Sequence, residues 1–65
     1  MTARAWPELP AKLRAHVVET LLTEAAKYDR AALDEHAEGR HQSADRYGVE
    51  AEAHRAAARA LEGTS

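Results

Sequence analysis

The sequence predicts an all-α fold, a two-helix antiparallel hairpin. Three observations lead to this prediction: the composition, the spacing of apolar residues and one interrupting glycine. Alanine, the best helix former, accounts for 16 of the 65 residues. Apolar side chains recur at steps of three and four, which is the period of an amphipathic helix. Gly39 then separates two such stretches and is a natural residue for the position just after a helix.

The elements follow in order along a single domain, residues 1–65. Residues 1–9 form a lead-in, because Pro7 and Pro10 push the residues before them away from helical geometry. A first helix is expected over about 10–37, where proline is well placed at the start. A turn follows at about 38–42, and a second helix covers about 43–62 with Ser43 as its N-cap. The alternative is one continuous helical rod over residues 10–62, which only a coiled-coil partner would stabilise.

The second helix carries a heptad seam that predicts how the two helices pack. Its members recur at steps of three and four: Ala44, Tyr47, Ala51, His54, Ala58 and Leu61. Folding the chain about Gly39 sets Leu61 opposite Val17, His54 opposite Glu24, and Tyr47 opposite Ala31 or Ala32. A second, alanine-lined strip runs along the other side of this helix.

The apolar surface of the first helix is wider than one partner helix can cover. One helix covers a stripe of about 100°, whereas this apolar arc exceeds 180°. The hairpin is therefore expected to dimerise into a four-helix bundle through the first helix and the lead-in. The interface residues expected on this reasoning are Trp6, Leu9, Leu13, Val18 and Leu22, with Val18 and Leu22 on an edge turned away from the second helix.

Composition excludes several classes of protein. The chain has no Cys, so disulfides, thiolate metal sites and cysteine nucleophiles are ruled out. No apolar run reaches the roughly 18 residues of a membrane span, and the N-terminus has no apolar signal segment. A cytoplasmic protein is therefore expected, with no membrane partner, no cofactor and no catalytic site. The net charge of −2 also argues against nucleic acid as a partner.

The expected function is a small non-enzymatic protein–protein interaction or assembly module, such as an accessory or regulatory subunit, that binds itself or another protein. One alternative is a metal-binding bundle with a site around His54, Glu24 and Glu50, because carboxylates and imidazoles converge between helices in such sites. His36 and His41 also flank the turn, where solvated histidines are ordinary. A second alternative is a small nucleic-acid-binding regulator that uses the basic flank of the second helix: Arg40, Arg46, Arg55 and Arg59.

Overall fold

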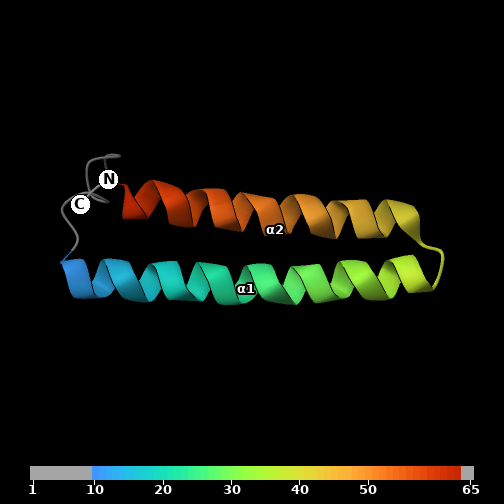
Figure 1. Ribbon diagram of the computed structural model, residues 1–65, viewed down its shortest axis with the longest axis horizontal. Coiled ribbons are helices and arrows are strands. Elements are labelled where there is room, and N and C mark those ends of the chain that lie inside the picture. The colour runs from blue at the N-terminus through green and yellow to red at the C-terminus, as the bar shows by residue number, and fades with distance from the viewer. Residues whose placement is uncertain (1–9, 64–65) are drawn as a thin grey trace.

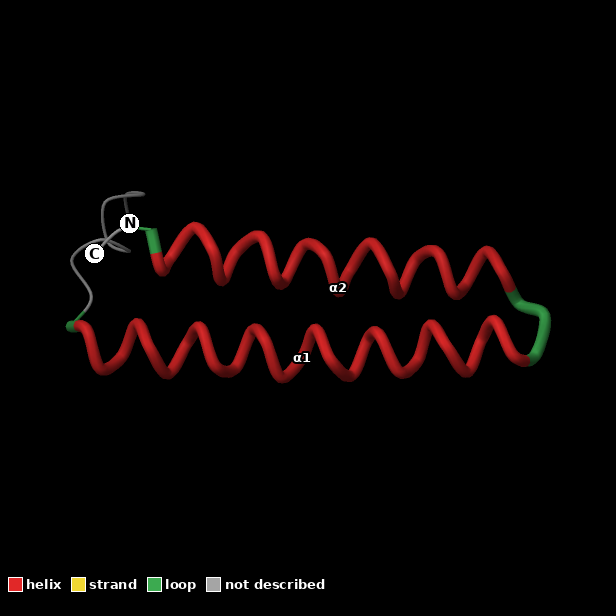
Figure 2. Tube along the Cα trace, in the orientation of Figure 1, coloured by secondary structure: helices red, strands yellow, loops and turns green. Residues whose placement is uncertain are grey.

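The computed structural model describes residues 10–63 and shows two antiparallel α-helices joined by a short turn (Figure 1). Helix α1 spans Ala11–Ala37 and helix α2 spans His41–Glu62. The two helices pack side by side along nearly the whole length of α2, as Figure 2 shows. The hairpin prediction is confirmed, and a continuous rod is excluded because the chain reverses direction after Ala37.

The turn is built on Gly39, which has a φ of +81°. This left-handed conformation strains residues that carry a Cβ but is open to glycine. The amide of Arg40 donates to the carbonyl of Glu35 at 2.8 Å, and the amide of Gly39 donates to the carbonyl of His36 at 3.0 Å. These two bonds form a Schellman motif, which satisfies carbonyls at the end of α1.

Helix α2 begins two residues earlier than the sequence predicts. It starts at His41, with the backbone of Ala44 already donating to the carbonyl of Arg40 at 3.0 Å. Ser43 therefore lies inside the first turn, and its predicted role as N-cap is wrong. Arg40 holds the N-cap position without a side-chain cap bond, because a guanidinium has no acceptor for the free amides of the first turn. Its guanidinium donates to Glu35 and Glu38 of the turn.

The core between the helices is built largely from alanine. Across residues 10–63 the buried apolar residues recur at heptad spacing on each helix: Val18 and Ala25 on α1, and Ala44, Ala51, Ala58 and Leu61 on α2. Val18, Ala58 and Leu61 form one cluster, against which Val17 and Leu21 pack. The seam predicted for the second helix is thus confirmed at its alanines and Leu61, and the expected proximity of Leu61 and Val17 is observed.

Candidate interaction surface

Among the residues predicted for the interface, the three that the structure describes, Leu13, Val18 and Leu22, do not share one exposed surface. Trp6 and Leu9 lie outside the described residues. Val18 is 8% exposed and packs against Ala58 and Leu61 of α2, so its predicted position on an edge facing away from α2 is wrong. The reason is that the heptad step from Val18 to Ala25 matches the alanine seam of α2, and this register turns Val18 inward.

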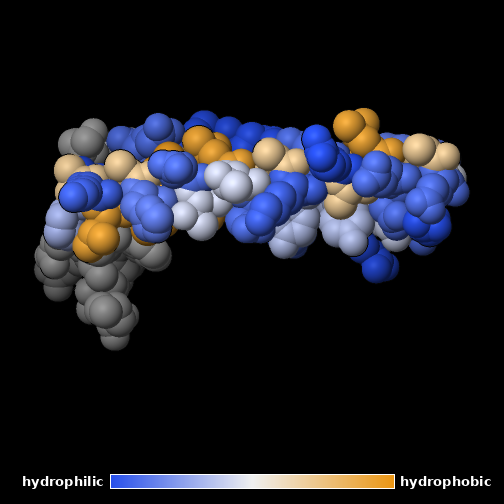
Figure 3. Space-filling view, turned by 90° about the horizontal axis from the view of Figure 1, so that it is seen from below, coloured by the Kyte–Doolittle hydropathy of each residue, from blue (hydrophilic) through white to orange (hydrophobic). Residues whose placement is uncertain are grey.

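Leu13 and Leu22 remain accessible, with 52% and 45% of each residue exposed. They are nine residues apart, and at about 100° per residue this spacing places them on opposite sides of α1. One flat partner surface cannot cover both. On the face shown in Figure 3, apolar groups lie apart and polar groups separate them.

A coherent exposed apolar edge does exist on α1, and it contains Leu22. The edge, called here the Leu22 edge, consists of exposed residues spaced by four and seven: Ala11, Ala15, Leu22, Ala26 and Leu33. Leu33 is 70% exposed. Leu22 and Leu33 are eleven residues apart, which returns to within about 20° of the same side of the helix. The interface predicted from the sequence does not include Leu33, although the spacing of the two leucines signals their alignment.

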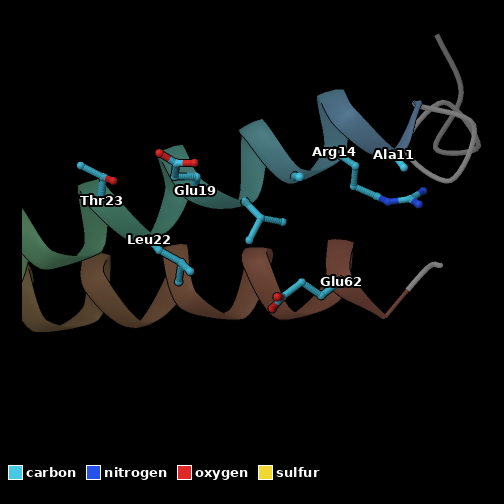
Figure 4. A pocket seen from close by; sticks show the side chains of 8 residues that line it. Ala11, Arg14, Glu19, Leu22, Thr23 and Glu62 are labelled. Atoms are coloured by element: carbon cyan, nitrogen blue, oxygen red, sulfur yellow. The ribbon is translucent and has the colours of Figure 1, made fainter.

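A shallow groove runs beside the first part of the Leu22 edge. Its apolar lining comes from Ala11, Ala15, Val18 and Leu22. In the close view of Figure 4, the side chain of Leu22 points toward α2, whereas those of Glu19 and Thr23 point away from it. The polar groups that border the groove are Arg14, Glu19, Thr23 and Glu62. The groove therefore has an apolar floor and a margin that carries charges of both signs.

An ion-pair network crosses from α1 to α2 near the middle of the hairpin. The guanidinium of Arg55 binds Asp29 at 2.8 Å and Glu52 at 3.2 Å, and Arg59 binds Glu52 at 3.1 Å. Hydrogen bonds from Arg59 and then Arg55 lower the pKa of Glu52. Hydrogen bonds to Asp29 and Glu52 raise the pKa of Arg55. Arg55 and Arg59 are thus paired with carboxylates of their own chain, which weakens the case for a basic nucleic-acid-binding flank.

A second network surrounds the turn. Arg40 binds Glu35 at 2.7 Å and Glu38 at 2.8 Å. The hydrogen bond from Arg40 is the largest cause of a lowered pKa at Glu35, and the two carboxylates raise the pKa of Arg40. Beside them, the Nδ1 atoms of His36 and His41 lie 2.8 Å apart, with both side chains exposed. Sequence inspection placed both histidines at the turn but did not predict their direct contact.

The region around His54 is aromatic and does not assemble the predicted metal ligands. The His54 ring packs 5.1 Å from the ring of Tyr28, and Tyr28 lies 6.1 Å from Tyr47. His54 donates its Nδ1 proton to the backbone carbonyl of Glu50 at 2.7 Å. Glu24 binds Lys27 of its own helix at 3.3 Å, so the expected contact between Glu24 and His54 is replaced. Within residues 10–63, no three His, Cys, Asp or Glu side chains are grouped to hold a metal ion.

No known family model matches this sequence, and neither a curated protein nor a solved structure matches it. In the part of the chain that the structure describes, neither helix is long and apolar enough to cross a membrane. The functional argument therefore depends on the surfaces and side-chain groupings described above.

Proposed function

We propose that this chain is a non-enzymatic protein–protein association module that pairs with a second copy of itself to form a four-helix bundle. One observation carries the proposal: the hairpin buries mostly alanine while larger apolar side chains stay exposed. Four of the six buried apolar residues in the described chain are alanines. The exposed large apolar residues in the same region are Leu13, Leu22, Leu33, Tyr47 and Val49.

The energetics favour burial of the Leu22 edge. Full burial of a leucine side chain stabilises a protein by roughly 1.5 to 3 kcal/mol. Leu22 is 45% exposed and Leu33 is 70% exposed, so covering both contributes roughly 2 to 3 kcal/mol per chain. A core of this size supplies only about 3 to 5 kcal/mol by itself. Association through this edge would therefore add a large fraction to the stability of each hairpin.

The charges around the groove favour a second copy as the partner. Arg14 borders the groove together with Glu19 and Glu62. In a two-fold symmetric dimer the same patch meets itself, and a margin with both charge signs allows opposite charges to face each other. A strongly acidic or strongly basic partner would instead meet like charges at this margin. The Leu22 edge, rather than the side of α1 that carries Leu13, is the surface we assign to this contact.

Light scattering coupled to size-exclusion chromatography tests the proposal directly. At micromolar concentration the wild-type chain is expected to show twice the monomer mass of 7.1 kDa. Leu22→Glu is expected to return the mass to that of the monomer and to lower the melting temperature, because a charge is placed in the apolar contact. Leu13→Glu is the matched control, since it makes the same change on the opposite side of α1 and is expected to leave the dimer intact.

The concentration dependence of unfolding provides a second measurement. Dimerisation couples stability to concentration, so the melting temperature of the wild-type chain is expected to rise as the protein is concentrated. A folded 7.1 kDa species with a melting temperature independent of concentration would refute self-association. Dissociation by Leu13→Glu, with Leu22→Glu still dimeric, would show that the contact lies on the other side of α1.

A further inference from the structure

His36 and His41 form an exposed imidazole pair that the proposed association does not use. His36 lies in the last turn of α1, and His41 is the first residue of α2. Their Nδ1 atoms are 2.8 Å apart, and their ring centroids are 5.0 Å apart with the planes inclined by 48°. The turn thus brings two imidazoles from different helices into direct contact at the closed end of the hairpin.

At 2.8 Å, either a proton or a metal ion must lie between the two nitrogens. Two imidazole nitrogens that both present lone pairs repel each other at hydrogen-bond distance. A proton carried by one ring relieves the repulsion, since a neutral imidazole has one donor and one acceptor nitrogen. A metal ion that accepts both lone pairs relieves it equally well, and imidazole is the commonest metal ligand among side chains.

The geometry of the pair suits two adjacent positions of a metal ion. Zinc–imidazole bonds are about 2.0 to 2.1 Å long. Ligands at a right angle are then about 2.8 to 3.0 Å apart, and tetrahedral ligands are about 3.3 to 3.4 Å apart. The observed separation of 2.8 Å matches ligands at a right angle and is about 0.5 Å shorter than tetrahedral ligands would have. Both rings are exposed, so neighbouring side chains leave them room to turn toward one ion.

The surrounding charges are compatible with a cation. Arg40 is the nearby positive group, and it is held by Glu35 and Glu38 at 2.7 and 2.8 Å. One guanidinium and two carboxylates leave a formal charge of −1 beside the imidazoles. Because Arg40 engages both carboxylates, they are not free to act as further ligands. The site offers two protein ligands, and water would complete the coordination.

We propose that His36 and His41 bind one divalent late first-row transition ion, of the Zn²⁺, Ni²⁺ or Cu²⁺ type, through their Nδ1 atoms. Imidazole ligands suit these ions. The bound ion links the end of α1 to the start of α2 across the turn, so binding also stabilises the folded hairpin. Both ligands lie beyond Leu33, the last residue of the Leu22 edge, and belong to one chain, so the proposed binding needs no second copy.

Calorimetric titration with Ni²⁺ and with Zn²⁺, combined with NMR of the histidine rings, tests the proposal. One ion per chain is expected to bind, and Zn²⁺ is expected to shift the ring signals of His36 and His41. The rings of His16 and His54 serve as internal references that should not move. A variant that lacks one of the two histidines can hold the ion through one imidazole only. His36→Gln and His41→Gln are therefore each expected to weaken binding of the ion by about tenfold or more.

Two controls separate a chelating pair from independent surface histidines. His16→Gln removes an exposed imidazole from α1 and is expected to leave the affinity unchanged. The double variant His36→Gln/His41→Gln is expected to lose little more than either single variant, because a chelate is already broken by one substitution. Circular dichroism verifies that each variant remains helical. An affinity for Ni²⁺ and Zn²⁺ that is equal in wild type and His36→Gln would overturn the proposal and leave the pair as a hydrogen bond only.

Discussion

Replacing Gly39 by alanine and replacing Gly48 by alanine are expected to change the stability of the protein in opposite directions. Gly39 has a φ of +81°, whereas Gly48 lies inside α2, and an added Cβ would meet nothing within 4 Å at either position. At Gly39, alanine must adopt a left-handed conformation that costs about 1 to 2 kcal/mol. Reduced freedom of the unfolded chain offsets about 0.4 to 1 kcal/mol of this cost. Gly39→Ala is therefore expected to destabilise the hairpin by about 1 kcal/mol.

At Gly48 the same change is expected to stabilise the protein. Alanine in a helix interior is favoured over glycine by about 0.5 to 1 kcal/mol, and the open space around Gly48 adds no clash. The two variants should thus differ by about 1.5 to 2 kcal/mol, or about 6 to 16 °C in melting temperature for a chain of this size. Thermal unfolding followed by circular dichroism at one fixed concentration measures the difference. A melting temperature raised by Gly39→Ala would refute the left-handed turn and with it the Schellman ending of α1.

The remaining predictions concern the core and the ion pairs. Leu61→Ala is expected to lower the free energy of unfolding by about 2 to 3 kcal/mol and the melting temperature by about 10 to 20 °C. The reason is that Leu61 and Val18 are the two buried residues of the described core that are larger than alanine. Leu13→Ala, the same change at an exposed position, is expected to stay within about 0.5 kcal/mol of wild type, and equal losses at both positions would contradict the observed packing. Hydrogen bonds from Arg40 and Arg59 lower the pKa of Glu35 and Glu52, respectively, in the folded protein. The unfolded state therefore binds more protons at these two glutamates than the folded state does. The stability that these ion pairs contribute is present above the usual pKa of 4.5 and is lost as the pH falls through the lowered pKa values of the folded protein. Acid titration of unfolding, with Glu52→Gln as the comparison, is expected to show a shallower loss in the variant below that pH, and identical acid profiles would argue against the Glu52 ion pairs.

The outcome at Val18 shows why sequence periodicity alone could not define the interaction surface. The apolar arc of α1 includes Leu13, Val18 and Leu22, and any of them could face a partner. Which of these residues faces α2 depends on how each helix is rotated about its own axis. That rotation is determined by how the side chains of the two helices pack together. Val18 packs against Ala58 and Leu61 and fills the space that the small side chain of Ala58 leaves between the helices. That packing turns Leu22 to one margin of the hairpin and Leu13 to the other.

The side-chain groupings were predictable only where they depend on local spacing. Glu52 and Arg55 are three residues apart on one helix, so their ion pair follows from the sequence. His54, expected opposite Glu24, instead donates to the backbone carbonyl of Glu50 one turn earlier on its own helix, which its position in the sequence does not reveal. The contact of His36 with His41 required the particular path of the turn, which no periodicity describes.

The sequence by itself determined the helices, the position of the turn and the alanine seam of α2, because each depends on local propensity or on a fixed helical period. Gly39 ends α1 because it adopts a left-handed backbone conformation that is open to glycine, and this depends on that residue alone. Only the three-dimensional structure decided that Val18 is buried and that the two turn histidines meet. The burial of Val18 depends on the rotation and register of the two helices, which are determined by contacts between residues distant in the sequence. The meeting of the histidines depends on the backbone path of the turn, which a helical period does not describe.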